Sequence, residues 1–316
     1  MRSIYCPSKL NERGETVEIG SAQELNKETV LPTTVMGSRL TELVMHGLER
    51  VHRVPGMAVQ GTPVWAHDWD VLCVLDGLRV DTAREVVDES VGSYRSVGST
   101  SREWLAETFP DHDLDKIAYL TGNPFANEEI PTDRLGYFHQ EAVCETRFGV
   151  ETVSPTPLRD RAVAAWRRRD DLGIDRLIVH FMQPHVPFRS RPEWFEEFLG
   201  TDTWGSSTWE AVVTGDIDRE AWFNAYRDNL VWALEDGVDP LCERIDATVG
   251  VTADHGNAAG EWGIAGHPQT VAVPSVRRVP WWTRAATREV EDVPEMDLES
   301  STAVDREKQL EALGYL

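Results

Sequence analysis

Four short apolar runs that alternate with segments of helical periodicity limit the fold of this chain more than any other feature. The run VLCVL at 71–75 is continuous rather than alternating, which is typical of a strand buried on both faces. The segments 116–124, 175–185 and 247–256 are each predicted to hold a strand that runs into a turn or loop, with the strands at 116–120, 177–182 and 249–253, and a fifth strand is predicted at 271–282. Strands that alternate with helices predict an α/β fold with a mostly parallel central sheet covered by helices on both faces.

Apolar residues at helical spacing occupy much of the chain between these strands. We expect helices at 38–53, 101–109 and 157–171, and a long amphipathic helix at 219–245. The long helix is predicted to break or bend near Gly237 and Pro240.

The composition predicts a folded domain with an acidic surface. Of the 316 residues 41% are hydrophobic, enough for a substantial core. We expect residues 1–60 to form an N-terminal arm and a helix that packs on the core, and residues 61–316 to form a single domain. The net charge of −23, from 54 acidic and 31 basic residues, would repel nucleic acids and anionic membranes. Only four of the basic residues are lysines, which favours a halophilic source, with an acidic mesophilic protein as the alternative.

The cysteines and the first residues indicate an intracellular protein. Cys6, Cys73, Cys144 and Cys242 form neither a C-x-x-C pair nor a zinc spacing. No apolar stretch has the length of a membrane span, and the N-terminus lacks the apolar stretch of a signal peptide. We therefore expect a soluble, cytoplasmic protein.

Polar residues follow the predicted strands at the points where these strands end. Asp76 follows the first strand, His185 the third, and Asp254 with His255 the fourth. Because the carboxyl ends of parallel strands meet at one edge of a sheet, we expect these four side chains to converge. Asn123, after the second strand, lines the same cleft or forms a turn. A lone Asp in such a place is more often a cap or turn former, so the combination is what indicates a site.

The residue types at this edge indicate a metal ion. Carboxylates with imidazole suit Zn²⁺, Mn²⁺, Mg²⁺ or Ca²⁺, and these ligands do not separate the four ions. Small residues after His255 allow the backbone to turn sharply and bring His267 back toward the same edge. The alternative is a surface loop with two solvated histidines.

Three hydroxyls, Ser99, Thr100 and Ser101, stand at the start of the predicted helix at 101–109. A hydroxyl at a helix N-terminus faces free N–H groups and a favourable dipole, which suit a tetrahedral anion such as phosphate or sulfate. A neighbouring dication would make it a better nucleophile. The structural alternative is a capping box, which Thr100 and Glu103 fit.

Four motifs occur in order along roughly residues 65–316. They are VLCVLDGLRVD at 71–81, HFMQPHVPF at 180–188, VTADHGNAAGEWGIAGHP at 251–268 and REKQLEALGYL at 306–316. Their D-x-L-R-x-D, P-H-x-P-[YF], D-H-G…G-E…G-H and L-x-x-L-G-Y patterns resemble the sulfatase-like branch of the alkaline phosphatase superfamily. The resemblance implies that the domain is a catalytic domain with that α/β fold.

Matched position by position, the resemblance also implies which residues bind the metal and which residue is the nucleophile. Asp76, Asp254 and His255 would be ligands of a divalent metal, with one ion more in keeping with the sequence than two. Ser101 would be the nucleophile.

The remaining candidates concern the substrate. The resemblance implies that His185 and His267 contact its anionic group, assist the leaving group or bind a second ion. Arg79, which matches the opening motif, would bind substrate or shape its loop. From their positions we add Thr100 and Asn123 as substrate-binding candidates.

The chain also departs from the sulfatase pattern. Neither a cysteine nor Ser101 stands in the C-x-P-x-R or S-x-P-x-R context that is oxidised to formylglycine, so we expect plain hydroxyl chemistry. Gly77 replaces a second acid of many sulfatases, and Asn257 the usual Glu, which makes T-A-D-H-G-N similar to cofactor-independent phosphoglycerate mutases.

We therefore predict a metal-dependent hydrolase or transferase that acts on a phosphate ester, ahead of a sulfate ester, through a hydroxyl nucleophile. Its substrate would be a small anionic ester or a glycan or lipid headgroup, without a nucleic-acid partner or a membrane span. The alternative is a catalytically inactive sulfatase-like binding or accessory protein, which the departures at the nucleophile segment and at Gly77 support.

Overall fold

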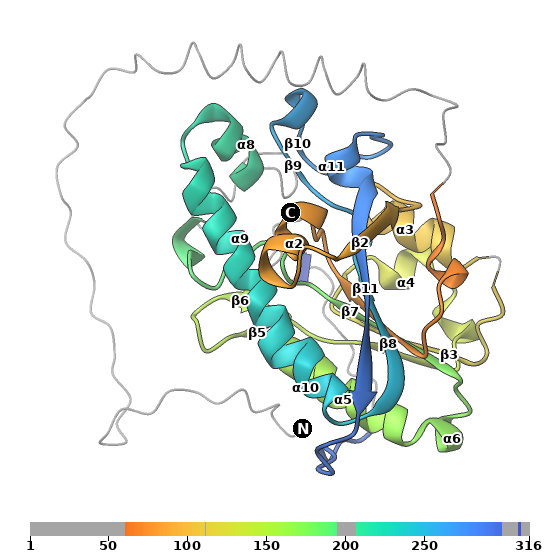
Figure 1. Ribbon diagram of the computed structural model, residues 1–316. Helices are drawn as coiled ribbons and strands as arrows, with labels where there is room; N and C mark the ends of the chain where they lie inside the picture. The colour runs from red at the N-terminus through yellow and green to blue at the C-terminus, as the bar shows by residue number, and fades with distance from the viewer. Residues whose placement is uncertain (1–60, 111, 195–206, 299–308, 311–316) are drawn as a thin grey trace, which may run out of the picture.

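The structure is a computed structural model that describes residues 61–110, 112–194, 207–298 and 309–310 (Figure 1). The arm and helix predicted within residues 1–60 lie outside the described residues, as does most of the tail motif at 306–316.

A mixed sheet of seven strands forms the centre of the described part of the chain (Figure 1). Its strands are β1 (Val71–Leu75), β2 (Gly92–Arg95), β3 (Ile117–Thr121), β4 (Tyr137–Gln140), β7 (Arg176–Phe181), β8 (Asp246–Thr252) and β11 (Arg278–Thr287). They lie in the order β2-β11-β8-β1-β7-β3-β4, and neighbours are parallel except where β11 pairs with β2 and β8. The predicted α/β fold with a mostly parallel sheet is confirmed.

Helices and two small strand pairs make up the rest of the regular structure. The pairs are β5 (Cys144–Glu145) with β6 (Glu151–Thr152), and β9 (Ala258–Ala259) with β10 (Ala265–Gly266). The α-helices are α2 (Val80–Val86), α3 (Ser101–Thr108), α4 (Ala126–Glu129), α5 (Pro155–Arg167), α6 (Arg169–Leu172), α8 (Ser207–Thr214), α9 (Arg219–Ala233), α10 (Asp239–Cys242) and α11 (Pro274–Arg277). Single turns of other helix types are η1 (Val64–Ala66), η2 (Thr132–Arg134), the π-helical η3 (Leu234–Val238) and η4 (Glu261–Gly263).

Helices cover both faces of the sheet, as the side chains of β7 show. Consecutive residues of a strand point to opposite faces. On one face the backbone of Gly237 in η3 packs on Phe181, so closely that a Cβ there would stand 3.1 Å from the Phe181 ring. On the other face Trp104 of α3 meets the ring of His180 edge-on, with centroids 5.5 Å apart. Helix α3, which begins at Ser101, therefore lies on the face of the sheet to which His180 points.

Several predicted elements have different bounds or character in the structure. The helix expected at 219–245 is divided into α9, η3 and α10, with the irregular turn around Gly237 as predicted. The strand expected at 271–282 begins only at Arg278, because Pro274 opens the short helix α11. Strands β2 and β4 were not predicted.

The described helices include none whose length and apolar character would let it cross a bilayer.

Candidate active site

Three ligand-type side chains meet at the carboxyl ends of β1 and β8. Asp76 directly follows β1, and Asp254 and His255 follow β8 one residue beyond its end. The two strands are parallel neighbours, so their carboxyl ends lie side by side. One ligand atom from each of the three residues lies within 4.8 Å of the other two, and all three residues are fully buried. The structure thus brings together the three residues predicted to hold a metal.

Asp254 is oriented by the backbone around it. Its Oδ1 accepts hydrogen bonds from the N–H groups of Gly77, at 3.0 Å, and His255, at 2.9 Å. Its Oδ2 is buried and has no hydrogen-bond partner among the described residues. A carboxylate oxygen is seldom left buried in this way, because desolvation without a partner is costly.

In Asp76, too, one carboxylate oxygen is hydrogen-bonded and the other has no partner in the described structure. Oδ2 accepts hydrogen bonds from the Ser101 hydroxyl and from Nδ2 of Asn123, each at 3.1 Å. Oδ1 is buried without a hydrogen-bond partner in the part of the chain described. Both carboxylates therefore keep one oxygen free, and both free oxygens face His255, at 3.6 Å from Asp76 Oδ1 and 3.4 Å from Asp254 Oδ2.

His255 presents its free nitrogen to the same point. Its Nδ1–H donates to the carbonyl of Gly256 at 2.9 Å, which leaves the Nε2 lone pair directed at the carboxylates. Two unpartnered carboxylate oxygens and one imidazole nitrogen form a ligand set that fits Zn²⁺ or Mn²⁺ with an open position for substrate.

The electrostatics of the two carboxyls also favour a cation. Burial, and then the neighbouring Asp254, raise the pKa of Asp76 to about 8. Burial would also raise the pKa of Asp254, but His255 and His180 outweigh it and lower that pKa below its ordinary value. Without a metal, the pair is therefore expected to hold one proton between its two carboxyls at neutral pH.

Of the three hydroxyls before α3, the structure directs only that of Ser101 at the carboxylates. Ser101 Oγ lies 3.1 Å from Asp76 Oδ2 and 3.3 Å from Nε2 of His255. Thr100 Oγ1 instead caps α3 by accepting the N–H of Glu103 at 3.1 Å. The Ser99 hydroxyl donates to the Glu103 carboxylate at 2.6 Å. Thr100 thus caps α3, while Glu103 reaches back to Ser99 rather than to the Thr100 N–H in the hydrogen bonds of the described structure. Ser101 is left as the hydroxyl that can act at the site.

His185 and His267 lie beside this cluster. Nε2 of His185 is 3.3 Å from Nε2 of His267, and the ring of His267 stacks on that of His255 with centroids 4.2 Å apart. Both residues are nearly fully buried. Burial lowers the pKa of each imidazole, so both rings are neutral at pH 7.

The remaining candidates, Arg79 and Asn123, form hydrogen bonds and ion pairs that hold neighbouring segments together. The guanidinium of Arg79 binds the carboxylates of Asp81 and Glu261 and the carbonyl of Asn257, which ties the loop after β1 to the segment after β8. Asn123 both orients Asp76 and accepts the N–H of Phe125 at 3.0 Å, as in an Asx turn.

His180, within β7, is not among the residues predicted for the site, yet it lies beneath the cluster. Its Nδ1 pairs with the Tyr119 hydroxyl at 2.9 Å. Its Nε2 points at the carboxylates, 3.7 Å from Asp76 Oδ2 and 3.6 Å from Asp254 Oδ2. Burial lowers the pKa of His180 to about 4, so the ring is neutral. His180 is the first histidine of the HFMQPH segment, but its position inside a strand does not reveal which face of the sheet its side chain occupies.

Comparison with known proteins adds similarities of fold. No family model matches the chain, and no curated protein matches it. Among solved structures, it is similar to the soluble domain of lipooligosaccharide phosphoethanolamine transferase A from Neisseria meningitidis, with 15% identity, a TM-score of 0.45, and 77% of this chain and 86% of that one covered. It is also similar to the C-terminal periplasmic domain of phosphoethanolamine transferase EptC from Campylobacter jejuni, with 17% identity, a TM-score of 0.42, and coverage of 67% and 78%. The corresponding EptC domain from Escherichia coli, solved in complex with Zn, gives 12% identity, a TM-score of 0.42, and coverage of 73% and 76%.

Phosphoethanolamine transferases are members of the superfamily that the motifs of this chain resemble. At sequence identities of 12–17%, the similarity shows a shared fold and does not assign the activity of these proteins to this one.

Proposed function

We propose that this protein is a metal-dependent hydrolase or transferase of phosphate esters, with Ser101 as its nucleophile. One observation carries the proposal: the free carboxylate oxygens of Asp76 and Asp254 and the free nitrogen of His255 converge beside the Ser101 hydroxyl. A purely structural cluster would have no reason to leave two buried carboxylate oxygens without hydrogen bonds.

Asp76, Asp254 and His255 would hold one divalent ion. When bound, the ion supplies charge that polarises the phosphoryl group and favours the deprotonated hydroxyl. The imidazole ligand favours Zn²⁺ or Mn²⁺ over Mg²⁺ and Ca²⁺.

The chain's own residues supply the remaining steps. Ser101 Oγ attacks phosphorus in line, so that a P–Oγ bond forms while the bond to the leaving oxygen breaks. The Ser101 hydroxyl donates to Asp76 Oδ2 at 3.1 Å, and this carboxylate is placed to accept its proton. His267 lies beside the cluster and is placed to donate a hydrogen bond to a phosphoryl oxygen, whereas the N–H of neutral His185 is held by the carbonyl of Val186 at 2.9 Å. The leaving oxygen takes up the proton that the Asp76 carboxylate received from Ser101. Water, or an acceptor alcohol, then cleaves the phosphoserine and restores Ser101.

The direct test is turnover of p-nitrophenyl phosphate, bis-p-nitrophenyl phosphate and p-nitrophenyl sulfate with several divalent ions in molar salt. We expect hydrolysis of a phosphate substrate that EDTA abolishes. Ser101→Ala should lower kcat by about a thousandfold or more while the protein still binds metal, because only the nucleophile is lost. Ser99→Ala is the matched control, since its hydroxyl is committed to Glu103.

Asp254→Ala should instead remove both metal and turnover. If the wild-type protein binds no divalent ion and turns over none of the three substrates, the non-catalytic binding protein is the better description. An added alcohol such as glycerol or ethanolamine separates transfer from hydrolysis through the products.

A further inference from the structure

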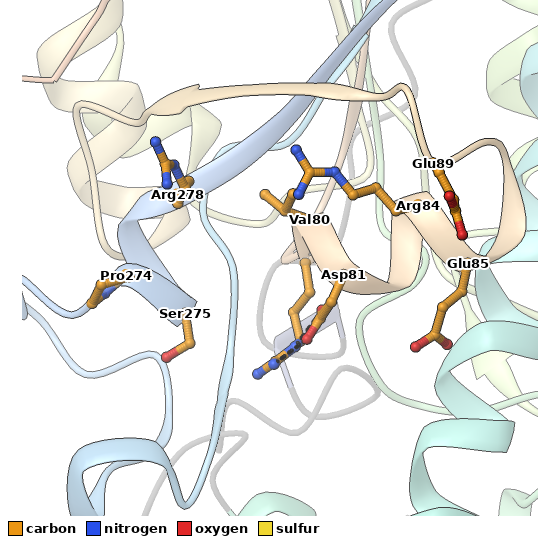
Figure 2. Close-up of a pocket in the computed structure, with 9 residues that line it drawn as sticks. Val80, Asp81, Arg84, Glu85, Glu89, Pro274, Ser275 and Arg278 are labelled. Atoms are coloured by element: carbon orange, nitrogen blue, oxygen red, sulfur yellow. Dashed lines mark hydrogen bonds and ion pairs between the residues drawn. The ribbon is translucent and has the colours of Figure 1, made fainter.

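A cavity of about 660 Å³ lies between α2 on one side and α11 with the start of β11 on the other (Figure 2). Figure 2 shows Arg84 extending from α2 across Val80 toward Arg278, which begins β11. Ser275 of α11 lines the same cavity. None of these residues contributes to the cluster of Asp76, Asp254 and His255.

Two of the arginines that line this cavity, Arg84 and Arg278, make no ion pair among the described residues, whereas the third, Arg79, is bound to Asp81 and Glu261. Arg278 stands directly opposite Arg95 in the antiparallel pairing of β11 with β2, so the two side chains occupy the same face of the sheet. In the described part of the chain, Arg84 donates one hydrogen bond, from its Nε to the carbonyl of Val91 at 3.0 Å. Among the described residues, Arg84, Arg95 and Arg278 make no ion pair with an acid, and like charges in direct cross-strand contact destabilise a sheet.

Many arginines of this acidic chain are paired with acids, for example Arg102, Arg159, Arg189 and Arg227. Arg134 and Arg191 lack an ion pair in the described structure, as Arg84 and Arg278 do, but neither of them lines this cavity. Two arginines without ion pairs that share one cavity can together bind an anion that the protein itself does not supply.

The acids that line the cavity do not neutralise these arginines. Asp81 is bound to Arg79, and Glu85 to Arg227, which leaves Glu89 as the lining carboxylate without an ion pair in the described part of the chain. Figure 2 shows Glu85 and Glu89 at the end of the cavity away from Arg278. The end formed by Arg84 and Arg278 is therefore the electropositive end.

Ser275 adds an unused hydrogen-bonding group. Its Oγ is buried and has no partner among the described residues, although the side chain lines the cavity. A buried hydroxyl without a partner is uncommon, and a rotation about χ1 would bring it to a ligand.

We propose that this cavity is a second anion-binding site, separate from the metal centre, that takes a phosphate or polyphosphate group between Arg84 and Arg278. The guanidinium groups bind the oxyanion in charge-assisted hydrogen bonds, and the negative charge relieves the repulsion between Arg278 and Arg95. The proposal does not depend on the function proposed for the metal centre.

We test this proposal by isothermal titration calorimetry of the full chain with inorganic pyrophosphate. The buffer contains EDTA so that no metal is bound. We expect saturable binding to the wild type and unchanged binding to Asp254→Asn. The double variant Arg84→Gln/Arg278→Gln should bind at least about tenfold more weakly, because two charge-assisted contacts are lost. The matched control is Arg134→Gln/Arg191→Gln, which removes the same charge from two other arginines that make no ion pair in the described structure.

Three results would overturn the proposal. One is the absence of binding to the wild type at millimolar pyrophosphate. The second is equal weakening in both double variants, which would show only a general effect of charge. The third is loss of binding in Asp254→Asn with retention in Arg84→Gln/Arg278→Gln, which would place the anion at the metal centre.

Discussion

Gly77 illustrates how closely single residues are constrained at the metal centre. Its φ of +69° lies in the left-handed region that favours glycine, and a Cβ there would stand 2.6 Å from Nδ2 of Asn257. Its N–H holds Asp254 in place at 3.0 Å. The absence of an acid at this position, which supported an inactive protein in the sequence analysis, thus has a structural reason.

We expect Gly77→Ala to destabilise the fold by about 2 kcal/mol or more and to lower metal affinity, because both backbone strain and a clash displace Asp254. Gly173→Ala is the matched control, since Gly173 has a φ of +68° but nothing within 4 Å of its added Cβ. This control should cost only the backbone part, about 1 kcal/mol. Urea unfolding measures both, and equal losses would contradict the account.

The raised pKa of Asp76 predicts how metal binding depends on pH. In the metal-free fold this carboxyl keeps its proton up to a pKa of about 8, whereas in the unfolded chain it loses the proton near pH 4. Between these pH values the folded state therefore binds more protons than the unfolded state. The free energy of unfolding of the metal-free protein consequently falls as pH rises from about 4 to about 8. Asp254, whose pKa is lowered, loses its own stabilising contribution only at lower pH.

Because a metal displaces the shared proton, the rise in Tm that Mn²⁺ gives over EDTA should grow between about pH 6 and about pH 8. Thermal unfolding with the ion or with EDTA at each pH measures it. A metal effect that is the same at both pH values would show that Asp76 is ionised throughout.

At the scale of elements, α3 and the segment after His267 are linked by Glu103. Its carboxylate accepts the Ser99 N–H at 2.9 Å, the Ser99 hydroxyl at 2.6 Å and the Thr270 N–H at 2.6 Å. The helix that carries Ser101 and the loop that carries His267 are therefore joined through one side chain. Glu103 acts as a positioning residue, since it contacts neither Asp76 nor His255 in any hydrogen bond of the described structure.

We expect Glu103→Ala to lower kcat by about tenfold or more with a smaller change in KM, because the nucleophile loses its alignment. Glu103→Gln, which keeps an acceptor oxygen, should recover part of the rate. Glu107→Ala, an exposed acid one turn further along the same helix, should leave kcat unchanged. Similar losses in Glu103→Ala and Glu107→Ala would remove the positioning role.

The elements differ in how well the sequence predicts them. Continuous apolar runs at β1, β3, β7 and β8 follow from burial on both faces, and the structure places them at the centre of the sheet. Strand β2, with the sequence GSYR, lies at the edge and is partly exposed, so it carries no apolar run. The late start of β11 follows from Pro274, which opens a helix within a run that reads as a strand.

The candidate site was predictable to the extent that it depends on topology. Parallel strands bring their carboxyl ends together, so the approach of Asp76 to Asp254 follows from the order of the strands. The choice of Ser101 over Ser99, and the location of His180 beneath the carboxylates, depend on side-chain contacts between distant segments. No local pattern specifies such contacts.

The whole molecule carries a net charge of −23, and its self-repulsion should weaken the fold at low ionic strength. Salt screens this repulsion, so we expect the Tm to rise by several degrees between about 0.1 M and about 2 M KCl. Circular dichroism measures the transition, and an equal concentration of a neutral osmolyte separates screening from exclusion at the surface. A Tm that falls or stays constant over this range would argue against adaptation to salt.

The account as a whole depends on a single dication held between the ends of β1 and β8. Crystals of the protein grown with Mn²⁺ or Zn²⁺ allow the ion to be located by anomalous scattering. We predict one peak about 2.0–2.2 Å from a carboxylate oxygen of Asp76, a carboxylate oxygen of Asp254 and Nε2 of His255. Full metal loading with no peak between these three side chains, or with the ion bound elsewhere, would contradict it.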